Sequence, residues 1–297
     1  MTQNTPISLR NRNRRRWLIE SGCLAAVGLI GLSRKSQAAG SKIRVGMTPA
    51  FLHDQHKLLR EWSDYMAASL QRPVEFIQRD SYRETMDLLR LEKLEFAWIC
   101  DYPFLHLKQE VRLLAVPLYR GRPYYSSYLI VRKDNTRVNS IGDLAGSVFA
   151  YADPYSNTGY LSPRYHIRQV GRDPATFFRK TFFTWSHRKV VEAVASGLAH
   201  GGAVDSYIWD TLAHVEPALA ARTRVVWRSA EYGFPPFVSH HSVAADQFQL
   251  MQRHLLDMSR NDAGRRLLEH MYLDGFIVGS PALYDGVAHM MRAFGET

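Results

Sequence analysis

Short apolar runs alternate with stretches of helical periodicity along most of the chain. The runs Ile43–Met47 and Val74–Ile77 have the length and composition of buried strands. Between them, from Leu58 to Leu70, apolar residues recur at spacings of one, three and four, which is the pattern of an amphipathic helix. A strand–helix–strand order of this kind predicts a largely parallel sheet covered by helices.

The same alternation continues toward the C-terminus. Further predicted strands, all short and apolar, are Phe96–Ile99, Leu113–Pro117, Val148–Ala150, Thr181–Thr184, Gly202–Val204 and Phe276–Val278. Further helices are predicted from a capping box at Ser81–Glu84, from about Gly159, over Arg188–Ser196 and through most of the last 60 residues. The sequence therefore predicts an α/β fold.

Two segments interrupt the alternation. Tyr124–Arg132 is a long continuous β run, and Tyr232–Val238 places Gly233 and two prolines beside apolar residues. We interpret the first as a strand that crosses from one lobe to another and the second as the return crossing. The chain length, 297 residues with 46% apolar side chains, is sufficient for two lobes of roughly 100–150 residues each.

The first 38 residues have the pattern of an export signal. Basic residues precede a 10-residue apolar core at Cys23–Leu32, and the small residues Ser36–Ala38 suit a signal peptidase. Arg14–Leu18 resembles the twin-arginine motif, so we expect twin-arginine export, with general secretion as the alternative. Cys23 precedes the apolar core, unlike a lipoprotein cysteine. We expect a periplasmic mature chain.

Net charge and hydropathy exclude two classes of protein. The formal charge is +10, but residues 1–38 hold seven basic groups and one acidic group, and the remainder carries a net charge of only about +4. This charge does not require a nucleic-acid partner, although it favours a small anion. No apolar run reaches the ~18–20 residues of a membrane-spanning helix, which excludes membrane insertion of the mature chain.

Enzymatic signatures are absent from the sequence. It contains no phosphate-binding P-loop, nucleophile elbow, zinc-protease motif or dinucleotide fingerprint. His53 and His56, like His240 and His241, have no cysteine or carboxylate at metal-ligand spacing, so we interpret them as surface or supporting histidines. We expect a binding protein without a cofactor or catalytic residues.

The segment Ala150–Arg164 is the strongest local indication of a binding site. A predicted strand ends there, and Ser156, Asn157 and Thr158 lead into a helix. Backbone N–H groups, the helix dipole and hydroxyl donors therefore meet at one point, which suits a tetrahedral anion. The alternative is that Ser156 or Thr158 only caps the helix.

Six segments in order resemble the periplasmic solute-binding proteins for phosphate, phosphite and phosphonate. Asp153–Leu161 resembles the "DPxSTSGYL" anion loop of that family, with Asn157 and Thr158 where Thr and Ser are usual. The other five are Ile43–Pro49, Phe96–Phe104, Tyr128–Lys133 followed by Ile141–Gly146, Ser186–His187 followed by Val190–Ala195, and Gly202–Tyr207. The likeness covers almost the whole mature chain.

The resemblance implies a type 2 periplasmic-binding fold and an interlobe ligand site. Lobe one would comprise residues 39–128 and 236–297, and lobe two residues 129–235. Ser156, Asn157, Thr158 and His187 would bind the anion, Tyr102 would close the site from lobe one, and Thr48 and Tyr207 would be further ligand-binding residues. Asp205 would accept a hydrogen bond from a protonated oxyanion or pair with an ammonium group of the ligand. The alternatives are that His187 and Asp205 are helix caps.

Cys100 leaves a second ligand class open. It is the lone cysteine of the expected mature chain, so it forms no intramolecular disulfide. A thiolate at the cleft would bind trivalent arsenic, which implies an arsenite sensor that feeds a histidine kinase instead of an ABC transporter permease. The alternative is a buried core cysteine. A thiol-dependent enzyme using Cys100, His187 and Asp205 is the minor alternative.

Overall fold

A computed structural model describes residues 42–49 and 56–296. The predicted signal peptide, residues 1–38, and His53 lie outside the described residues. The strands are β1 (Ile43–Met47), β2 (Val74–Gln78), β3 (Phe96–Trp98), β4 (Val111–Leu118), β5 (Tyr124–Tyr125), β6 (Ser127–Arg132), β7 (Val148–Tyr151), β8 (Lys180–Phe183), β9 (Gly201–Asp205), β10 (Thr223–Arg228), β11 (Tyr232–Gly233), β12 (Phe237–His240) and β13 (Gly275–Ile277).

The helices lie between and after these strands. The α-helices are α1 (His56–Leu70), α2 (Tyr82–Arg90), α3 (Asp101–His106), α4 (Ser162–Gln169), α5 (His187–Ser196), α6 (Ser206–Val215), α7 (Pro217–Ala220), α8 (Ala245–Leu256), α9 (Asp262–His270) and α10 (Asp285–Ala293). The 3-10 turns are η1 (Gly142–Leu144), η3 (Met258–Arg260) and η4 (Pro281–Tyr284), and η2 (Asn157–Leu161) is a π-helical turn that continues directly into α4.

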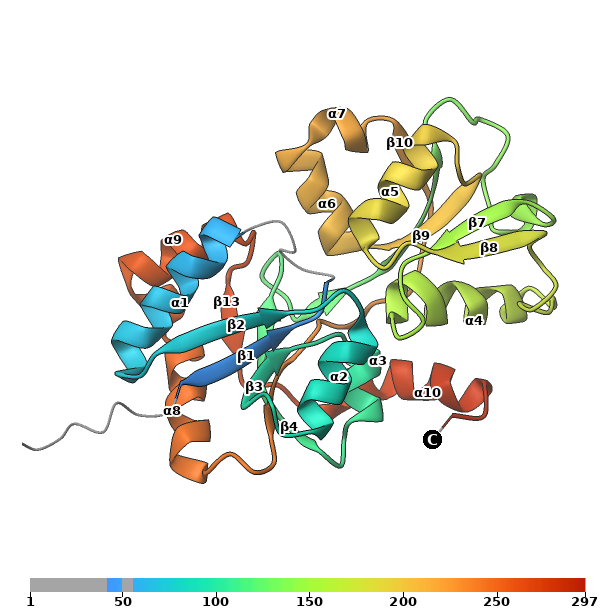
Figure 1. Ribbon diagram of the computed structural model, residues 1–297. Helices are drawn as coiled ribbons and strands as arrows, with labels where there is room; N and C mark the ends of the chain where they lie inside the picture. Colours follow the sequence, from blue (N-terminus) through green and yellow to red (C-terminus); the bar gives the residue numbers. More distant parts are fainter. Residues whose placement is uncertain (1–41, 50–55, 297) are drawn as a thin grey trace, which may run out of the picture. The chain divides into compact units, whose positions relative to one another are not determined.

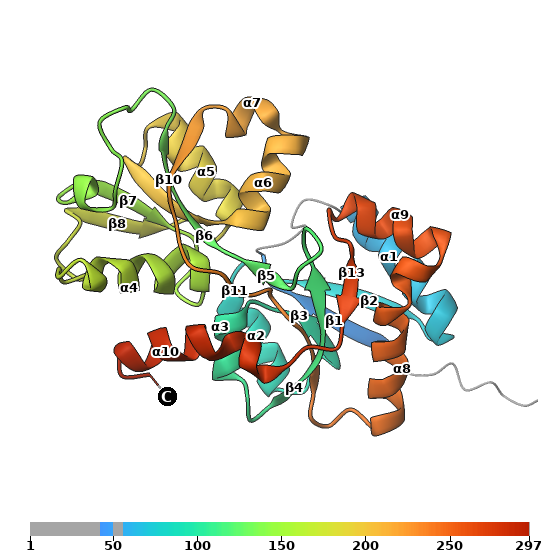
Figure 2. The same cartoon turned by 180° about the vertical axis from the view of Figure 1, so that it is seen from behind.

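Two sheets form the centres of two lobes. The first has the strand order β13-β4-β12-β3-β1-β2, and the second has the order β10-β6-β9-β7-β8. Helices α1, α8 and α9 lie on one face of the first sheet, with α2 and α3 on the other (Figure 1). Helices α5, α6 and α7 cover one face of the second sheet, and α4 lies on the other (Figures 1 and 2). The predicted α/β, two-lobed fold is confirmed.

The two crossing segments pair with each other between the lobes. The run predicted over Tyr124–Arg132 divides at Ser126 into β5 and β6, and β5 pairs with β11 of the return segment (Figure 2). Ser126 is held outside both strands because its N–H donates to Ser206 Oγ and its carbonyl accepts from Ser206 N–H. The chain therefore changes sheets at this residue.

The prediction of largely parallel sheets is wrong. Only β2, β1 and β3 in the first sheet, and β8, β7 and β9 in the second, pair in parallel. Strands β12 and β6 run antiparallel to their neighbours because each enters its sheet along a crossing segment from the opposite lobe. The parallel strands nevertheless bring their carboxyl ends to one edge of each sheet.

Helix α2 shows how the sequence positions one such edge. Ser81 caps the helix, and its Oγ accepts the Glu84 N–H at 3.2 Å as predicted. The Glu84 carboxylate accepts from Asp80 N–H at 3.3 Å instead of from Ser81, so the capping box is completed one residue earlier than expected. The buried face of α2 carries Tyr82, whose ring is 1% exposed.

The core of lobe one is rich in aromatic residues. Trp62 of α1 packs edge-on against Trp98 of β3, with ring centroids 6.1 Å apart, and also against Phe237 of β12 at 5.8 Å. The Trp98 indole N–H donates to the Pro235 carbonyl at 2.9 Å, which satisfies its buried polar atom. The return crossing is therefore fixed to the first sheet by both packing and a hydrogen bond.

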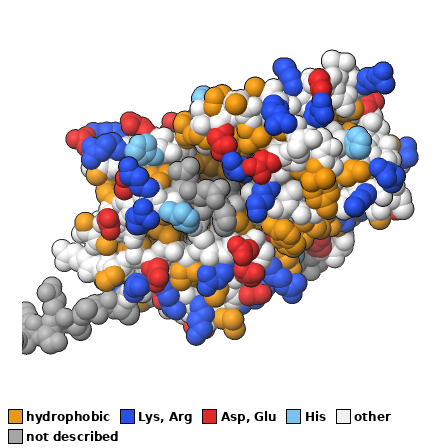
Figure 3. Space-filling view, turned by 45° about the horizontal axis from the view of Figure 1, so that its top comes forward, with side chains coloured by type: hydrophobic (Ala, Val, Ile, Leu, Met, Phe, Trp, Pro, Cys, Tyr) orange, Lys and Arg blue, Asp and Glu red, His pale blue; other side chains and the backbone are white. Residues whose placement is uncertain are grey.

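Basic and acidic side chains are interspersed on the face shown in Figure 3. Within residues 42–49 and 56–296, none of the helices is both long enough and apolar enough to cross a bilayer.

Candidate ligand-binding site

The predicted binding residues lie at the carboxyl ends of parallel strands in both lobes. In lobe one, Thr48 follows β1 and Cys100 follows β3. In lobe two, Ser156 follows β7, His187 follows β8 and Asp205 ends β9. Side chains from the two edges touch each other, as described below, so both edges face one interlobe site. Carboxyl ends of parallel strands are the usual position of ligand sites in α/β sheets.

Ser156, Asn157 and Thr158 form a buried turn, which we call the cradle, and all three are 0% exposed. Ser156 Oγ accepts the Gly159 N–H at 3.0 Å, so the residue does cap η2, as the alternative interpretation held. Gly159 leaves no room for a side chain, since a Cβ there would lie 2.5 Å from Ala152 Cβ. Thr158 Oγ1 and Asn157 Oδ1 have no hydrogen-bond partner within residues 42–49 and 56–296.

His187 is a neutral hydrogen-bond donor to the cradle. The Asp205 N–H donates to His187 Nδ1 at 3.1 Å, so Nδ1 carries no proton and Nε2 carries one. Nε2 lies 3.2 Å from Ser156 Oγ, to which it therefore donates. Burial lowers the pKa of His187 to about 3. His187 thus orients Ser156, whose Oγ accepts hydrogen bonds from both His187 Nε2 and the Gly159 N–H.

Asp101 connects the lobes and was not predicted as a site residue. Its Oδ2 accepts Asn157 Nδ2–H across the cleft at 2.8 Å, and its Oδ1 accepts Tyr125 OH at 2.8 Å and Tyr102 N–H at 2.8 Å. Burial raises the pKa of Asp101 to about 6 in spite of these hydrogen bonds. Because Asp101 holds Asn157 Nδ2, the amide oxygen of Asn157 is the end without a partner.

Cys100 lies in this network and is 2% exposed. Its Sγ is 3.0 Å from Asp101 Oδ1, to which the thiol donates, and 3.6 Å from Tyr125 OH. Burial, reinforced by the Asp101 charge, raises the pKa of the thiol well above its usual value. Cys100 is therefore a protonated, internally bonded thiol next to the interlobe contact.

A second hydrogen bond crosses the cleft, and in this one the donor belongs to lobe one and the carboxylate to lobe two. Asp153 of lobe two is 1% exposed, and its Oδ2 accepts the N–H of Tyr82 at the start of α2 at 3.1 Å. The helix dipole favours a negative charge at this position. Burial raises the pKa of the Tyr82 phenol well above its usual value, and its hydrogen bond with Ser156 works against this rise.

Asp205 occupies the capping position that was considered as its alternative role. Its Oδ1 accepts from Tyr207 N–H at 2.7 Å and from Ile208 N–H at 3.4 Å at the start of α6. Burial raises the pKa of Asp205 well above its usual value. The hydroxyl of Tyr207 donates to the Met271 carbonyl in lobe one at 2.5 Å, so Tyr207 contributes an interlobe contact.

Tyr102 and Thr48 complete the predicted set. The Tyr102 hydroxyl donates to Glu296 Oε2 at 2.5 Å, and its ring contacts Tyr155 of lobe two at a centroid distance of 6.4 Å. Tyr102 thus closes against Tyr155 and directs its hydroxyl away from the cradle. Thr48 is 0% exposed, and its Oγ1 has no hydrogen-bond partner among the residues that the structure describes.

The charge of the site is unusual for an anion pocket. Three buried carboxylates, from Asp101, Asp153 and Asp205, surround it, and none of the buried residues in the described part of the chain is Lys or Arg. A fully ionised dianion would be repelled by these carboxylates. No group of metal-ligating side chains occurs among the described residues.

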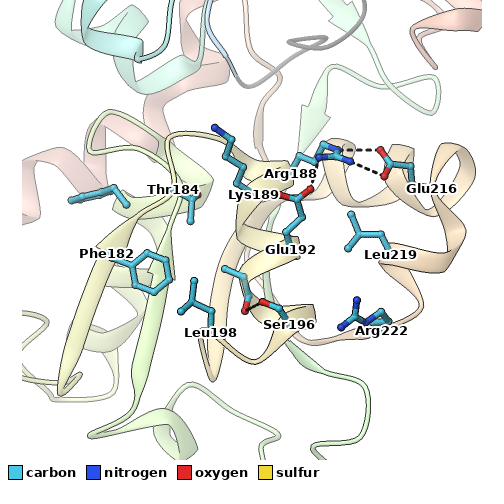
Figure 4. Close-up of a pocket in the computed structure, with 12 residues that line it drawn as sticks. Phe182, Thr184, Arg188, Lys189, Glu192, Ser196, Leu198, Glu216, Leu219 and Arg222 are labelled. Carbon is cyan, nitrogen blue, oxygen red and sulfur yellow. Dashed lines mark hydrogen bonds and ion pairs between the residues drawn. The ribbon is translucent and has the colours of Figure 1, made fainter.

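Two of the hollows that border lobe two are lined by residues of helix α5. One, of about 370 Å³, is lined by residues of both lobes: Pro49, Asp80, Ser81, Arg83, Glu84, Trp185, Ser186 and Lys189. The other, of about 620 Å³, is formed within lobe two between β8, α5 and α7 (Figure 4). In it Arg188 is held by Glu216 and Glu192, as the dashed lines of Figure 4 show. The first hollow lies between the lobes, and so does a further one of about 420 Å³, which Arg164 and Arg168 of lobe two and Phe294 of lobe one help to line.

Comparisons with known proteins identify the family of the chain. A family model described as "ABC transporter, phosphonate, periplasmic substrate-binding protein" matches residues 45–284. The phosphate-import protein PhnD of Mycolicibacterium smegmatis is 22% identical over 251 residues, which are 75% of this chain and 76% of that protein. The phosphonates-binding periplasmic protein of Escherichia coli is 24% identical over 185 residues, covering 59% of this chain and 54% of that protein.

Solved structures share the fold. The structure of PhnD1 from Prochlorococcus marinus in complex with methylphosphonate has a TM-score of 0.78 and 19% sequence identity, and the match covers 86% of this chain and 99% of that chain. An ancestral arginine-binding protein bound to arginine has a TM-score of 0.58 at 16% identity, covering 78% of this chain and 99% of that one. These likenesses establish a type 2 periplasmic-binding fold.

Proposed function

Because the chain belongs to the family of periplasmic substrate-binding proteins of phosphonate ABC transporters, we propose that its two lobes close around a tetrahedral phosphorus oxyanion. The ligand is a phosphonate, phosphite or phosphate, and a transporter permease receives it. The mature chain acts in the periplasm. Its role is to bind and deliver the ligand, as in other members of the family, and it requires no catalytic residue.

One observation carries the proposal. Thr48 Oγ1 and Thr158 Oγ1 are buried hydroxyls without a hydrogen-bond partner in the described part of the chain, and they come from opposite lobes. A buried hydroxyl that makes no hydrogen bond destabilises the protein by about 1–3 kcal/mol, so such atoms usually have a use. An oxyanion between the lobes accepts a hydrogen bond from each hydroxyl.

The protonation state of the ligand follows from the remaining groups. Asn157 Oδ1 is a buried acceptor without a partner, and an acceptor facing an anion is favourable only if the anion carries a proton. The carboxylates of Asp101 and Asp153 favour a single negative charge for the same reason. We assign the bound form of the ligand as a monoanion with one P–OH group. Asn157 Oδ1 accepts the hydrogen bond from this P–OH group, which is the role that the sequence analysis expected of Asp205.

Titration calorimetry on the purified mature protein tests this function. Methylphosphonate, phosphite and phosphate are titrated at pH 6, 7 and 8, with sulfate, arsenate and arsenite in parallel. We expect at least one phosphorus oxyanion to bind and sulfate, which carries no proton, to fail. A ligand at 100 times its Kd also stabilises the fold by about 2.7 kcal/mol, which a thermal melt detects. Binding of arsenite alone, or of none of these anions, contradicts the proposal.

The arsenite hypothesis depends on a Cys100 thiolate. Burial and the neighbouring Asp101 carboxylate both favour the protonated thiol, and Cys100 is the lone cysteine among the described residues. Trivalent arsenic prefers soft thiolate sulfur. The phosphorus oxyanion therefore fits the site better than arsenite, and a permease fits better than a histidine kinase as the partner.

A further inference from the structure

We propose that the hollow at the cleft mouth binds the organic substituent of a phosphonate, with the indole of Trp185 as its main contact. The inference rests on the proposed function, since it assigns the part of the ligand that projects out of the cradle. It makes Trp185 a specificity-determining residue. The substituent class is uncharged and apolar, with an aromatic ring as the best fit.

Trp185 has a backbone conformation that disfavours its side chain. Its φ is +62°, in the left-handed region, where a bulky residue is uncommon. The conformation is imposed by the neighbouring strand: Trp185 N–H donates to the Ala152 carbonyl at 2.7 Å, and Thr184 N–H donates to the Tyr151 carbonyl at 2.9 Å. Glycine would adopt this backbone without strain. The position instead carries tryptophan, the largest of the side chains.

The indole is presented toward the interlobe hollow. Trp185 is 46% exposed and lines the hollow of about 370 Å³, so one part of the ring packs on Phe183, at a centroid distance of 5.9 Å, while the rest is available. Pro49 of lobe one also lines the hollow. The volume is within the range of small-molecule sites.

Two residues that line the hollow are followed directly in sequence by residues that contact lobe two next to or within the cradle segment. On lobe two, Ser186 lines the hollow and the next residue, His187, donates to Ser156. On lobe one, Ser81 lines it and the next residue, Tyr82, contacts Asp153 through its N–H. A phosphonate held by its oxygens in the cradle therefore directs its carbon substituent toward this hollow.

The charged residues around the hollow do not select a charged substituent. Arg83 and Lys189 are balanced by Asp80 and Glu84, all four of which line it. Arg83 pairs with Asp87 at 3.9 Å, and Glu84 accepts from the Asp80 backbone. With equal numbers of each sign, the face of the indole is the feature that distinguishes one substituent from another, through ring stacking and apolar burial.

The test compares two ligands that differ only in the substituent. Methylphosphonate and phenylphosphonate are titrated into the wild-type protein and into Trp185→Ala, Trp185→Gly and Trp185→Phe. We expect wild type to prefer phenylphosphonate, and Ala and Gly to reduce this preference by roughly three- to tenfold, the range for an aromatic pair. The Trp185→Phe variant should keep most of the preference for phenylphosphonate. The affinity for methylphosphonate should stay within about twofold of the wild-type value in all three variants.

The matched Ala and Gly variants test the premise about the backbone. Both remove the ring, but only Ala keeps a Cβ in the left-handed conformation, so we expect Gly to melt about 2 °C or more above Ala. Leu198→Ala, at an exposed position of the other hollow, controls for a general effect of removing an apolar side chain from lobe two and should change neither affinity.

Four outcomes overturn the inference. Equal losses for both ligands show a structural role for Trp185, and an unchanged preference shows that the ring makes no contact. Wild type that binds methylphosphonate but not phenylphosphonate refutes the substituent pocket while leaving the proposed function intact. Wild type that binds neither phosphonate, phosphite nor phosphate refutes both.

Discussion

Replacing Thr158 by Val should separate ligand binding from folding. The two side chains have nearly the same shape, so Val fills the same buried space and removes only the hydroxyl. Thr158 is 0% exposed, and its Oγ1 has no hydrogen-bond partner among residues 42–49 and 56–296. Thr158→Ser is the matched control, because it keeps the hydroxyl and removes the methyl group.

The expected magnitudes follow from the state of this one atom. A hydrogen bond to a charged group contributes about 1.5–3 kcal/mol, so its loss should weaken oxyanion binding by about 10- to 150-fold. Stability should respond in the opposite direction. An unpartnered buried hydroxyl destabilises by about 1–3 kcal/mol, so Val should leave the free energy of unfolding of the unliganded protein unchanged or slightly higher.

Titration calorimetry gives the affinities, and urea denaturation without ligand gives the stabilities. Wild type and Thr158→Ser should bind within a few fold of each other, while Thr158→Val binds far more weakly and is at least as stable. If Val binds as tightly as wild type, the hydroxyl does not touch the ligand. If Thr158→Val binds the ligand more weakly and its free energy of unfolding falls by a similar amount, the hydroxyl serves folding instead of binding. The cradle is then an ordinary helix cap.

Three further perturbations test other parts of the molecule. Cys100→Ser should change phosphorus-oxyanion affinity by no more than a few fold in calorimetry, because the thiol is protonated and bonded internally; complete loss would revive the arsenite hypothesis. Burial raises the pKa of Asp101 to about 6, so the folded state holds this proton more tightly than the unfolded chain, and stability should fall by up to about 3 kcal/mol as pH rises from about 4 to about 6. Urea midpoints of wild type and Asp101→Asn at pH 4 to 7 check this: the difference between the two proteins should change with pH up to about 6 and be flat above it, and a constant difference would count against the shift. Changing both Arg14 and Arg15 to Lys should leave precursor in the cytoplasm by fractionation, whereas normal export would indicate the general secretory route.

Most elements could be predicted because their apolar pattern is strong. The strand at Ile43–Met47 was predicted with its observed bounds, and the helix expected at Arg188–Ser196 begins one residue earlier, at His187. Strand β10 was missed because it is an edge strand with few buried residues, so its alternation is weak. The antiparallel direction of β12 could not be predicted either, because it depends on the path of the chain through the other lobe.

Local sequence indicated the cradle but not its surroundings. Ser156 to Thr158 stand where a strand becomes a helix, which is visible in any window of the sequence. Asp101 has no such signal, because an acidic residue at the start of a helix usually lies on the surface and helps to cap it. Its burial results from Tyr125 and Asn157, which meet it only after both lobes have formed. The φ of Trp185 likewise depends on a strand thirty residues earlier.

The position of β12 in the middle of the first sheet determines the order in which the lobes can fold. Strands β3 and β4 both pair with β12, which follows the whole second sheet in the chain. Until residues 237–240 arrive, each has an unpaired inner edge, and open strand edges favour association between chains. The second sheet is contiguous in sequence and can form while the first is incomplete. During synthesis, lobe one is therefore the vulnerable half, although most of it is made first.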